Sequence, residues 1–328
     1  MKYDIVAIGS ATVDQFADTD SELIRIETPT TQEKLIAFPL GSKILVKELD
    51  LKVGGGGTNC ATTFSRLGMK TAFLGKVGND GNGDYVIQAL AREKIDFIGP
   101  RQGVTGLSII LNSFAHDRTI LAYKGANNNL HLNEIEPFDC EWVYLASMLL
   151  TSFDTVVELL SEHHYRVAFN PSNYQAEKGH EALMPLLQKT ELLVMNLEEA
   201  CKFMGEDYSE RPPAKQLLQK MAGLLPPKVF VITDGGDGVH VFDRNCFYRG
   251  YPADNLEVLE TTGAGDAFAS TFTAVFMRGF DMDKVIHFAM TNAESVLMHR
   301  GAKEKLLTWE ELVEQAKFIK RRVESELV

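Results

Sequence analysis

Short β-prone runs alternate with helical segments along most of the chain, and this alternation limits the possible fold more than any other feature. Residues 3–9 (YDIVAIG) form a nearly continuous apolar run that ends at a glycine, which is typical of a strand buried on both faces. Later runs of the same kind are TAFLGKVG, WVYLA, RVAFN, LLVMN and KVFVITDGG. We therefore expect an α/β fold whose main sheet is mostly parallel and is covered by helices on both faces.

Two segments interrupt this alternation. Residues 22–53 contain the pieces LIRIE, KLIAF and KILVKELDLKV, separated by Pro and Gly, which is the pattern of antiparallel strands with one solvated face. Residues 105–124 hold two adjacent strand candidates, TGLSIILNSF and RTILAYKG, joined by the polar turn AHD. We expect this hairpin to pair with the strands at 22–53 as a small separate β-sheet. The predicted organisation is a large α/β unit of residues 1–21, 51–104 and 125–328, and a small β lid of residues 22–50 and 105–124.

Polar residues stand at or just past the ends of several predicted strands. Because ligands collect at the carboxyl ends of strands in a parallel sheet, we expect these side chains to converge on one crevice. They are Asp14, Asn170, Asn196 and Thr233.

The charge balance excludes some partners. With 33 Lys and Arg against 45 Asp and Glu, the formal net charge is −12, and no basic cluster offers a surface for nucleic acid or an anionic membrane. No stretch approaches the length of a transmembrane helix, and Met1 leads directly into a strand instead of a secretory signal. The four cysteines have neither C-x-x-C nor zinc spacing, so we expect reduced, mostly packed thiols and a cytoplasmic protein.

Residues 260–276 (ETTGAGDAFASTFTAVF) place a turn of small residues directly before a helix. Gly263, Ala264 and Gly265 have little or no side chain, so their backbone N–H groups can close around an anion at the positive end of that helix. Asp266 follows at once, where a carboxylate suits a base that takes a proton from a nearby hydroxyl. A simple helix start capped by Asp266 is the alternative, but the surrounding small residues favour close approach of a ligand.

Four consecutive glycines lead into a second predicted helix, within residues 53–68 (VGGGGTNCATTFSRLG). The helix is predicted to run from Thr58 to about Leu67. Lysine is absent and the spacing is not G-x-x-x-x-G-K-[ST], so a P-loop is not indicated. A flexible hinge is one reading. We favour a surface where backbone lies against a polyhydroxy ligand, with Asn59 hydrogen-bonded to its hydroxyls.

These residues resemble the ribokinase-like, or PfkB, family of carbohydrate and nucleoside kinases over nearly the whole chain and in the family's motif order. The glycine run with Asn59 resembles the N-terminal signature of the family, and residues 260–270 resemble its C-terminal signature. The resemblance implies ATP-dependent phosphorylation of a hydroxymethyl group on a sugar, with Asp266 as general base and the 263–265 turn as anion hole. ATP and Mg²⁺ are the implied cofactors, and a monovalent cation such as K⁺ is a further candidate.

On the acceptor side, the resemblance implies a role for each matching residue. Asp14, in an early G-x-x-x-x-D, matches the carboxylate that grips substrate hydroxyls, with Gly55, Gly56 and Asn59 as its partners. Without the family, Asp14 is better explained as a turn cap than as a substrate contact. The lid is expected to cover the substrate, exclude water and mediate a homodimer contact.

On the nucleotide side, Asn196 and Glu199 (in NLEEA) match the N-x-x-E motif that organises Mg²⁺ and phosphate largely through water. Without the resemblance, NLEEA is a helix N-terminus with acidic residues that favour the helix dipole. Thr233, Gly235 and Gly238 (in TDGGDG) match the T-x-G-x-x-G that lies along the nucleotide, and a hairpin turn is the alternative reading.

The C-terminal part departs from the family pattern at two places. Gly301 resembles the glycine of the segment near the adenine, and counting back from it places Met290 where many relatives have Asn. Asn292 lies two residues later and is the predicted nucleotide contact, together with Gly265. Glu260 stands where the family more often has Asp, so a cation ligand at that position is in doubt.

The acceptor itself stays open. A sugar is the first choice, because no aromatic pair in the lid invites stacking of a base, although Phe114 and Tyr123 keep a nucleoside in consideration; sugar phosphates come third. From another class, the chain could be a sugar- or nucleotide-binding regulatory protein that has lost catalysis, against which the intact Asp266 argues. A nicotinamide dehydrogenase is disfavoured because Gly9 is followed by no G-x-G-x-x-G.

Overall fold

The computed structural model describes residues 2–19, 22–27, 32–112, 118–254, 256–299 and 301–328. The strands are β1 (Lys2–Ile8), β2 (Thr12–Thr19), β3 (Glu22–Glu27), β4 (Gln32–Ala37), β5 (Val46–Gly54), β6 (Thr71–Leu74), β7 (Asp96–Phe97), β8 (Gly106–Asn112), β9 (Arg118–Tyr123), β10 (Asp139–Leu145), β11 (Arg166–Phe169), β12 (Thr190–Asn196), β13 (Val229–Thr233), β14 (Val239–Phe242), β15 (Cys246–Gly250) and β16 (Val323–Leu327). The α-helices are α1 (Gly56–Arg66), α2 (Gly81–Arg92), α3 (Leu150–Glu162), α4 (Asn173–Glu177), α5 (Gly179–Ala182), α6 (Met184–Leu187), α7 (Leu197–Met204), α8 (Ala214–Leu224), α9 (Ala264–Met277), α10 (Met282–Leu297) and α11 (Trp309–Phe318). Short 3₁₀ helices are η1 (Gly125–Asn128), η2 (Leu132–Glu134), η3 (Tyr208–Glu210) and η4 (Gly235–Asp237).

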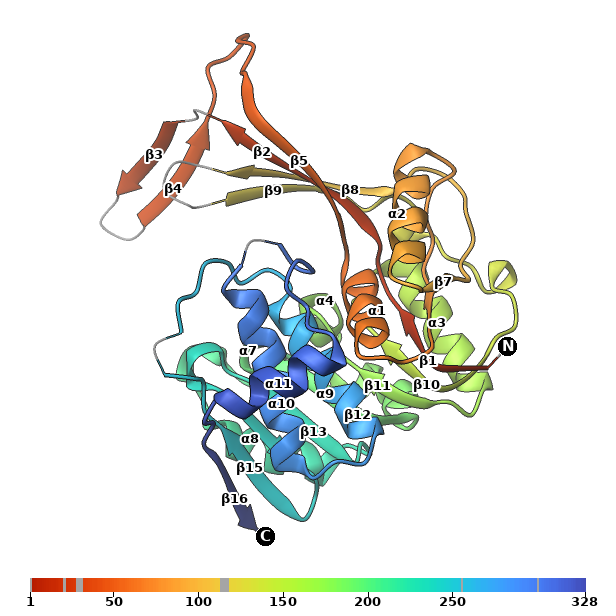
Figure 1. Ribbon diagram of the computed structural model, residues 1–328, viewed down its shortest axis with the longest axis vertical. Coiled ribbons are helices and arrows are strands. Elements are labelled where there is room, and N and C mark those ends of the chain that lie inside the picture. Colours follow the sequence, from red (N-terminus) through yellow and green to blue (C-terminus); the bar gives the residue numbers. More distant parts are fainter. Residues whose placement is uncertain (1, 20–21, 28–31, 113–117, 255, 300) are drawn as a thin grey trace.

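The main sheet is mostly parallel, which confirms the predicted fold class. Its order, within the described residues, is β16-β15-β14-β13-β12-β11-β10-β1-β6-β7. The strands from β7 to β13 pair in parallel, and the β13–β14, β14–β15 and β15–β16 pairs at the other edge are antiparallel. The parallel part brings the carboxyl ends of β1, β10, β11, β12 and β13 to one edge of the sheet (Figure 1).

Helices cover both faces of this sheet, and each face has its own apolar core. In β1, Ile5 and Ala7 pack into one core, while Val6 and Ile8 pack into the other; all four are fully buried. The first core takes in side chains of α1, α2, α9, α10 and α11, and the second takes in side chains of α3, α4, α6, α7 and α8. Burying such side chains contributes about 1.5–3 kcal/mol each, so continuous apolar runs like YDIVAIG are stable only between two helical layers.

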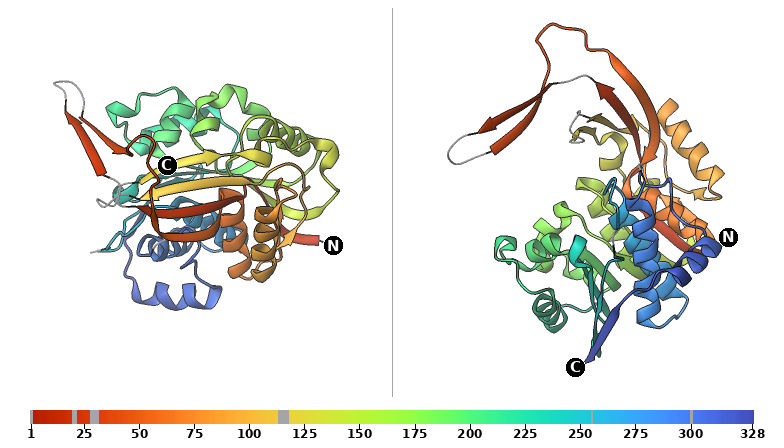
Figure 2. Two further views of the ribbon diagram at one scale, coloured as in Figure 1. Left: turned by 90° about the horizontal axis from the view of Figure 1, so that it is seen from above. Right: turned by 60° about the vertical axis from the view of Figure 1, so that its left-hand side comes forward.

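A second, smaller sheet projects from the α/β body, as Figures 1 and 2 show. Its order is β5-β2-β8-β9, and β3 pairs with β4 as a separate antiparallel hairpin. The predicted small sheet is therefore present, but its pairing differs from the expectation. Among the described residues, β8 and β9 share a sheet with β5 but do not pair with it directly, because β2 lies between β5 and β8 and pairs in parallel with β8. The predicted AHD turn lies outside the described residues.

Sequence reasoning missed β2 because only residues 9–11 separate it from β1 and because it carries several polar side chains. Val13 and Ala17 point inward and are almost fully buried, whereas Asp14 and Gln15 are partly exposed. The sheet consequently includes residues 12–19 and the end of β5, which the predicted division had assigned to the large unit.

Two glycines let α1 lie directly against β1. A Cβ atom on Gly57 would be 2.7 Å from the Cα atom of Gly9 and 2.7 Å from a ring carbon of Phe73. Gly55, just before the helix, has a φ of 96°, a left-handed conformation that favours glycine. The glycine run is thus a close helix–strand contact that fixes the first turn of α1 beside the end of β1.

Of the helices in the described part of the chain, none combines the length and the apolar content that crossing a bilayer requires. All four cysteines are free and buried, as the sequence predicted for packed, reduced thiols.

We predict that Gly57→Ala lowers the free energy of unfolding by about 1–3 kcal/mol, as overpacking of a tight contact does. Gly81→Ala is the matched control, because a Cβ there meets nothing within 4 Å; it should change stability by less than about 1 kcal/mol. Urea unfolding of both variants tests this. Equal stabilities would contradict the proposed close contact.

Candidate active site

The first turn of α9 holds Asp266 beside an open, small-residue turn. Gly263 precedes the helix with a φ of 80°, and a Cβ there would be 2.4 Å from the Cβ of Ala302. A Cβ on Gly265 would meet nothing within 4 Å, so the backbone is approachable on that side. Amide groups in the first turn of a helix have no partner within the helix and lie at its positive end. This turn can therefore accept an anion.

The first turn of α1 faces Asp266. Asn59 donates a hydrogen bond of 2.8 Å from Nδ2 to Asp266 Oδ2, and a Cβ on Gly56 would lie 3.5 Å from Asp266 Oδ1. The other amide atom of Asn59, Oδ1, is buried and has no hydrogen-bond partner among the residues that the structure describes. An unpaired buried acceptor is costly, so this atom is suited to a hydroxyl that a ligand brings.

The ionisation of Asp266 reflects opposing influences. Burial raises the pKa of its carboxyl group, whereas the hydrogen bond from Asn59 and the positive charge of Lys303 lower that pKa. A carboxylate that is desolvated but still stabilised as an anion is suited to act as a base.

Asp266 opens onto a cavity of about 170 Å³ at the carboxyl ends of β11, β12 and β13. The cavity brings together three of the four strand-end residues that were predicted to converge, namely Asn170, Asn196 and Thr233. Gly265 and Glu199 also line it. Asp14 does not line this cavity, because it lies within β2 instead of just past the end of β1.

Asn196 and Glu199 form a reciprocal cap at the start of α7. Asn196 Oδ1 accepts from the Glu199 N–H at 2.8 Å, and Glu199 Oε2 accepts from the Asn196 N–H at 3.0 Å. Burial, with the negative charges of Glu198 and Asp266, raises the pKa of Glu199 to about 7. The helix-start reading of NLEEA is therefore correct for the backbone, and the carboxyl group still faces the cavity.

The described residues contain no cluster of three or more His, Cys, Asp or Glu that could hold a metal ion. Mg²⁺ commonly keeps several waters and uses one or two carboxylates with substrate phosphates. A single carboxylate such as Glu199 beside an anion-accepting turn fits that mode of binding.

TDGGDG forms a tight turn between β13 and β14. The Asp234 N–H donates to Gly238 O at 2.8 Å, and both Gly235 (φ 51°) and Gly238 (φ 94°) are left-handed. A Cβ on Gly238 would be 2.1 Å from Gly250 O, whereas one on Gly235 would be in open space. Thr233 lines the cavity, and the two glycines are not among its lining residues.

Asn292 does not reach the site. It is fully buried in α10, where its Nδ2 donates to Thr271 Oγ1 at 2.7 Å and its Oδ1 accepts from the Leu307 N–H at 2.9 Å. Both ends of the amide are used, so the predicted nucleotide contact is replaced by a structural role. Met290 is also buried. Glu260 accepts a hydrogen bond of 2.9 Å from the Gly301 N–H, so this carboxylate fastens the C-terminal segment.

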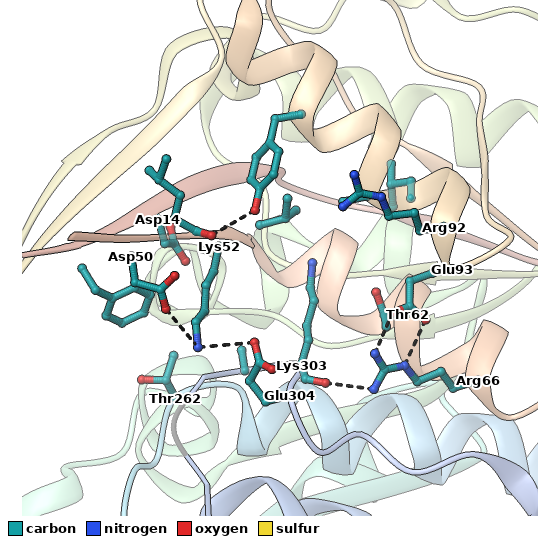
Figure 3. Close-up of a pocket in the computed structure, with 17 residues that line it drawn as sticks. Asp14, Asp50, Lys52, Thr62, Arg66, Arg92, Glu93, Thr262, Lys303 and Glu304 are labelled. Carbon is teal, nitrogen blue, oxygen red and sulfur yellow. Dashed lines mark hydrogen bonds and ion pairs between the residues drawn. The ribbon is translucent and has the colours of Figure 1, made fainter. Parts of the chain in front are cut away.

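Asp14 lines a second cavity, of about 510 Å³, between β2, β5, α1, α2 and residues 302–304 (Figure 3). Its Oδ1 accepts from Thr12 Oγ1 at 2.9 Å, and its carboxylate lies so close to Gly54 that a Cβ there would be 1.8 Å from Oδ2. Asp14 is thus held against Gly54, which directly precedes Gly55 and Gly56, two of the three residues with which it was predicted to act.

Lys303 points into the same cavity and was missed from the sequence. Its Nζ donates to Thr58 Oγ1 at 2.7 Å. Burial lowers the pKa of Lys303 to about 7, against the opposing effects of Asp14 and Asp266. In the sequence GAKEK this lysine cannot be told from a solvated one.

Comparison with known proteins shows the family of the chain. Residues 4–309 match the model of the pfkB family carbohydrate kinases. An uncharacterised sugar kinase of Archaeoglobus fulgidus is 27% identical over 252 residues, which cover 74% of this chain and 97% of the relative. The ribokinase of Haemophilus influenzae is 26% identical over 84% of this chain and 90% of the relative.

Among solved structures, the nucleoside kinase of Methanocaldococcus jannaschii, an archaeal member of the ribokinase family, superposes with a TM-score of 0.76 over 97% of this chain and 98% of that one. At 19% identity this likeness shows the fold alone. The family match over almost the whole chain goes further: the chain belongs to the pfkB family of carbohydrate kinases and is a phosphotransferase with an alcohol group as acceptor.

Proposed function

We propose that the chain transfers the γ-phosphoryl group of ATP to a hydroxymethyl group of a sugar, with Asp266 as general base. The observation that carries this proposal is the position of the Asp266 carboxylate: it adjoins the open 263–265 turn, accepts from Asn59 and opens onto the cavity at the strand ends. Phosphoryl transfer to an alcohol calls for a base and for a group that stabilises negative charge, which are Asp266 and the 263–265 turn. Asn59 Oδ1, which has no hydrogen-bond partner among the described residues, can accept a hydrogen bond from a substrate hydroxyl.

In the proposed reaction, the acceptor hydroxyl lies between Asp266 and the γ-phosphorus. Asp266 takes the hydroxyl proton as the new O–P bond forms and the bond from phosphorus to the β-phosphate oxygen breaks, which leaves ADP. The N–H groups of the 263–265 turn stabilise negative charge on the transferring group. Mg²⁺, when bound, neutralises phosphate charge, and Glu199 is the carboxylate that would hold it, largely through water.

The proposed acceptor contacts are Asp14, Gly55, Gly56 and Asn59, and the proposed nucleotide contacts are Asn196, Thr233, Gly235, Gly238 and Gly265. A sugar is favoured because the relatives from A. fulgidus and H. influenzae are named as a sugar kinase and a ribokinase. A nucleoside is the alternative acceptor. Two aromatic residues, Phe114 and Tyr123, suggested a nucleoside. Phe114 lies outside the described residues, while Tyr123 is half exposed on β9.

We also propose that two copies of the chain associate through the small sheet. Its strands expose large apolar side chains, which monomeric surfaces seldom gather in one place. They are Leu49, Leu51, Ile120, Leu121 and Tyr123, each at least 46% exposed.

We expect Asp266→Asn to lower kcat by about two to four powers of ten, as loss of a general base does, with little change in the affinity for ATP. ADP release with ATP and Mg²⁺, screened across free sugars, nucleosides and sugar phosphates, identifies the acceptor and gives the rate. Near-normal turnover in the variant would refute the role of Asp266. A flat response of the wild-type chain to every acceptor would instead favour a binding protein.

We expect Glu199→Gln to raise the Mg²⁺ concentration needed for half-maximal rate by about tenfold, the lower end of the effect of removing a group that orients a metal. Glutamine can keep the cap on α7, so the substitution tests the charge. Glu198→Gln is the matched control, because Glu198 pairs with Lys202 at 2.9 Å. If both variants need the same Mg²⁺ concentration for half-maximal rate, Glu199 is not a ligand of the metal site.

A further inference from the structure

Lys303 lines the larger cavity beside Asp14 and matches no residue of the family motifs. It lies on the segment between α10 and α11, and Figure 3 shows its side chain extending into the larger cavity, between Asp14 and Thr62. An ammonium group that is taken out of water needs a hydrogen bond and opposite charge to be retained. Lys303 has both. Thr58 accepts its hydrogen bond, and Asp14 and Asp266, the two carboxylates proposed to act on the phosphoryl acceptor, supply the negative charge.

We propose that Lys303 is a positioning residue of the phosphoryl-transfer site: its ammonium group keeps the Asp266 carboxylate ionised and, through Thr58, fixes the turn of α1 that carries Asn59. This inference rests on the proposed function, because it assigns Asp266 the role of base. It adds a cation on the acceptor side of the site that the sequence motifs did not indicate.

The contact with Thr58 explains how a lysine can act on α1. Thr58 is fully buried, and its hydroxyl donates to Gly54 O at 2.8 Å while it accepts from Lys303 Nζ at 2.7 Å. The Thr58 hydroxyl thereby joins the start of α1 to the last residue of β5, and the ammonium group of Lys303 holds that hydroxyl in place. The next residue is Asn59, whose Nδ2 holds Asp266 Oδ2 at 2.8 Å.

The charges around the two groups come from several elements. Lys303 is influenced by Asp14 on β2, Asp266 on α9, Glu93 after α2 and the Cys60 thiol on α1. Asp266 in turn acts on Glu199 of α7, Cys60 of α1 and Tyr144 of β10, and it is stabilised as an anion by Asn59 and Lys303.

Neighbouring cations are engaged elsewhere. Arg66 forms a paired contact with both Glu93 oxygens and donates to the carbonyls of Lys303 and Leu306. Lys52 pairs with Asp50 and Glu304 at 3.5 and 3.3 Å. Lys303 is the cation whose positive charge lowers the pKa of Asp266, and the exposed Lys305, two residues away, offers a matched control.

The pH dependence of kcat/KM provides a readout that a purely structural lysine would not move. Asp266 must be deprotonated, so activity is lost as pH falls through its pKa; removing a nearby cation raises that pKa. Burial lowers the pKa of Lys303 to about 7, so the lysine carries its charge throughout the acidic range in which Asp266 becomes protonated. Lys303→Met should therefore shift the acid limb upward by about one pH unit.

Lys303→Arg should keep the acid limb in place, because a guanidinium group also carries a positive charge in this pH range. Lys305→Met should leave the acid limb unchanged. If Lys303→Met lowers activity uniformly at all pH values, or if Lys303→Arg shifts the acid limb as far as Lys303→Met does, the electrostatic role is overturned.

A second measurement needs no catalysis and separates this inference from the proposed function. Lysine labelled with ¹³C at Cε gives an NMR signal for Lys303, assigned by its loss in Lys303→Met. In Asp266→Asn, the pKa of Lys303 should fall by about one unit because an opposing charge is gone. An unchanged pKa overturns the coupling even in an active kinase. A shifted pKa in a chain that phosphorylates no acceptor supports the coupling and refutes the proposed function.

Discussion

The hydrogen bond between Asn59 and Asp266 joins the two helix starts on which the candidate site depends. Each residue lies in the first turn of its helix, and 207 positions separate them in the sequence. The bond is possible because Gly9 and Gly57 let α1 approach β1 closely and because Gly263 turns the chain sharply into α9. Without this contact the Asp266 carboxylate would be buried with less to stabilise its anion, so the backbone geometry of three glycines bears directly on the proposed proton transfer.

The parallel sheet supplies the rest of the site through its topology. Strands β11, β12 and β13 lie side by side and point the same way, so Asn170, Asn196 and Thr233 meet although whole helices intervene between them in the sequence. The acceptor side is built differently. Asp14 comes from β2, a strand of the small sheet, and Lys303 from the C-terminal segment. The strand ends of the main sheet thus carry one part of the candidate site, and β2 and the C-terminal segment carry another part.

Sequence patterns predicted the parallel sheet, the two helix starts and the meeting of polar strand ends, because each follows from local rules of period, glycine placement and strand direction. They failed where the outcome depends on long-range pairing. Strand β2 is too polar to be recognised without its neighbours β5 and β8. Asn292 was assigned by counting along α10, which does not reveal that the amide faces Thr271 and Leu307. The hydrogen bond of Lys303 and the charges around it come from Thr58 and from carboxylates that are distant in the sequence, so the local sequence does not reveal them.

The C-terminal segment closes the site from far along the chain. Gly301 is fastened to Glu260, Lys303 reaches Thr58, and Arg66 holds the carbonyls of Lys303 and Leu306. A ribosome makes the glycine run and the strands of the cavity early and this segment late, so a growing polypeptide has Asn170, Asn196 and Thr233 before it has Lys303. Asp266 acquires its full surroundings only when synthesis has passed residue 303, and a nascent chain shorter than this lacks the charge balance on which the proposed proton transfer depends.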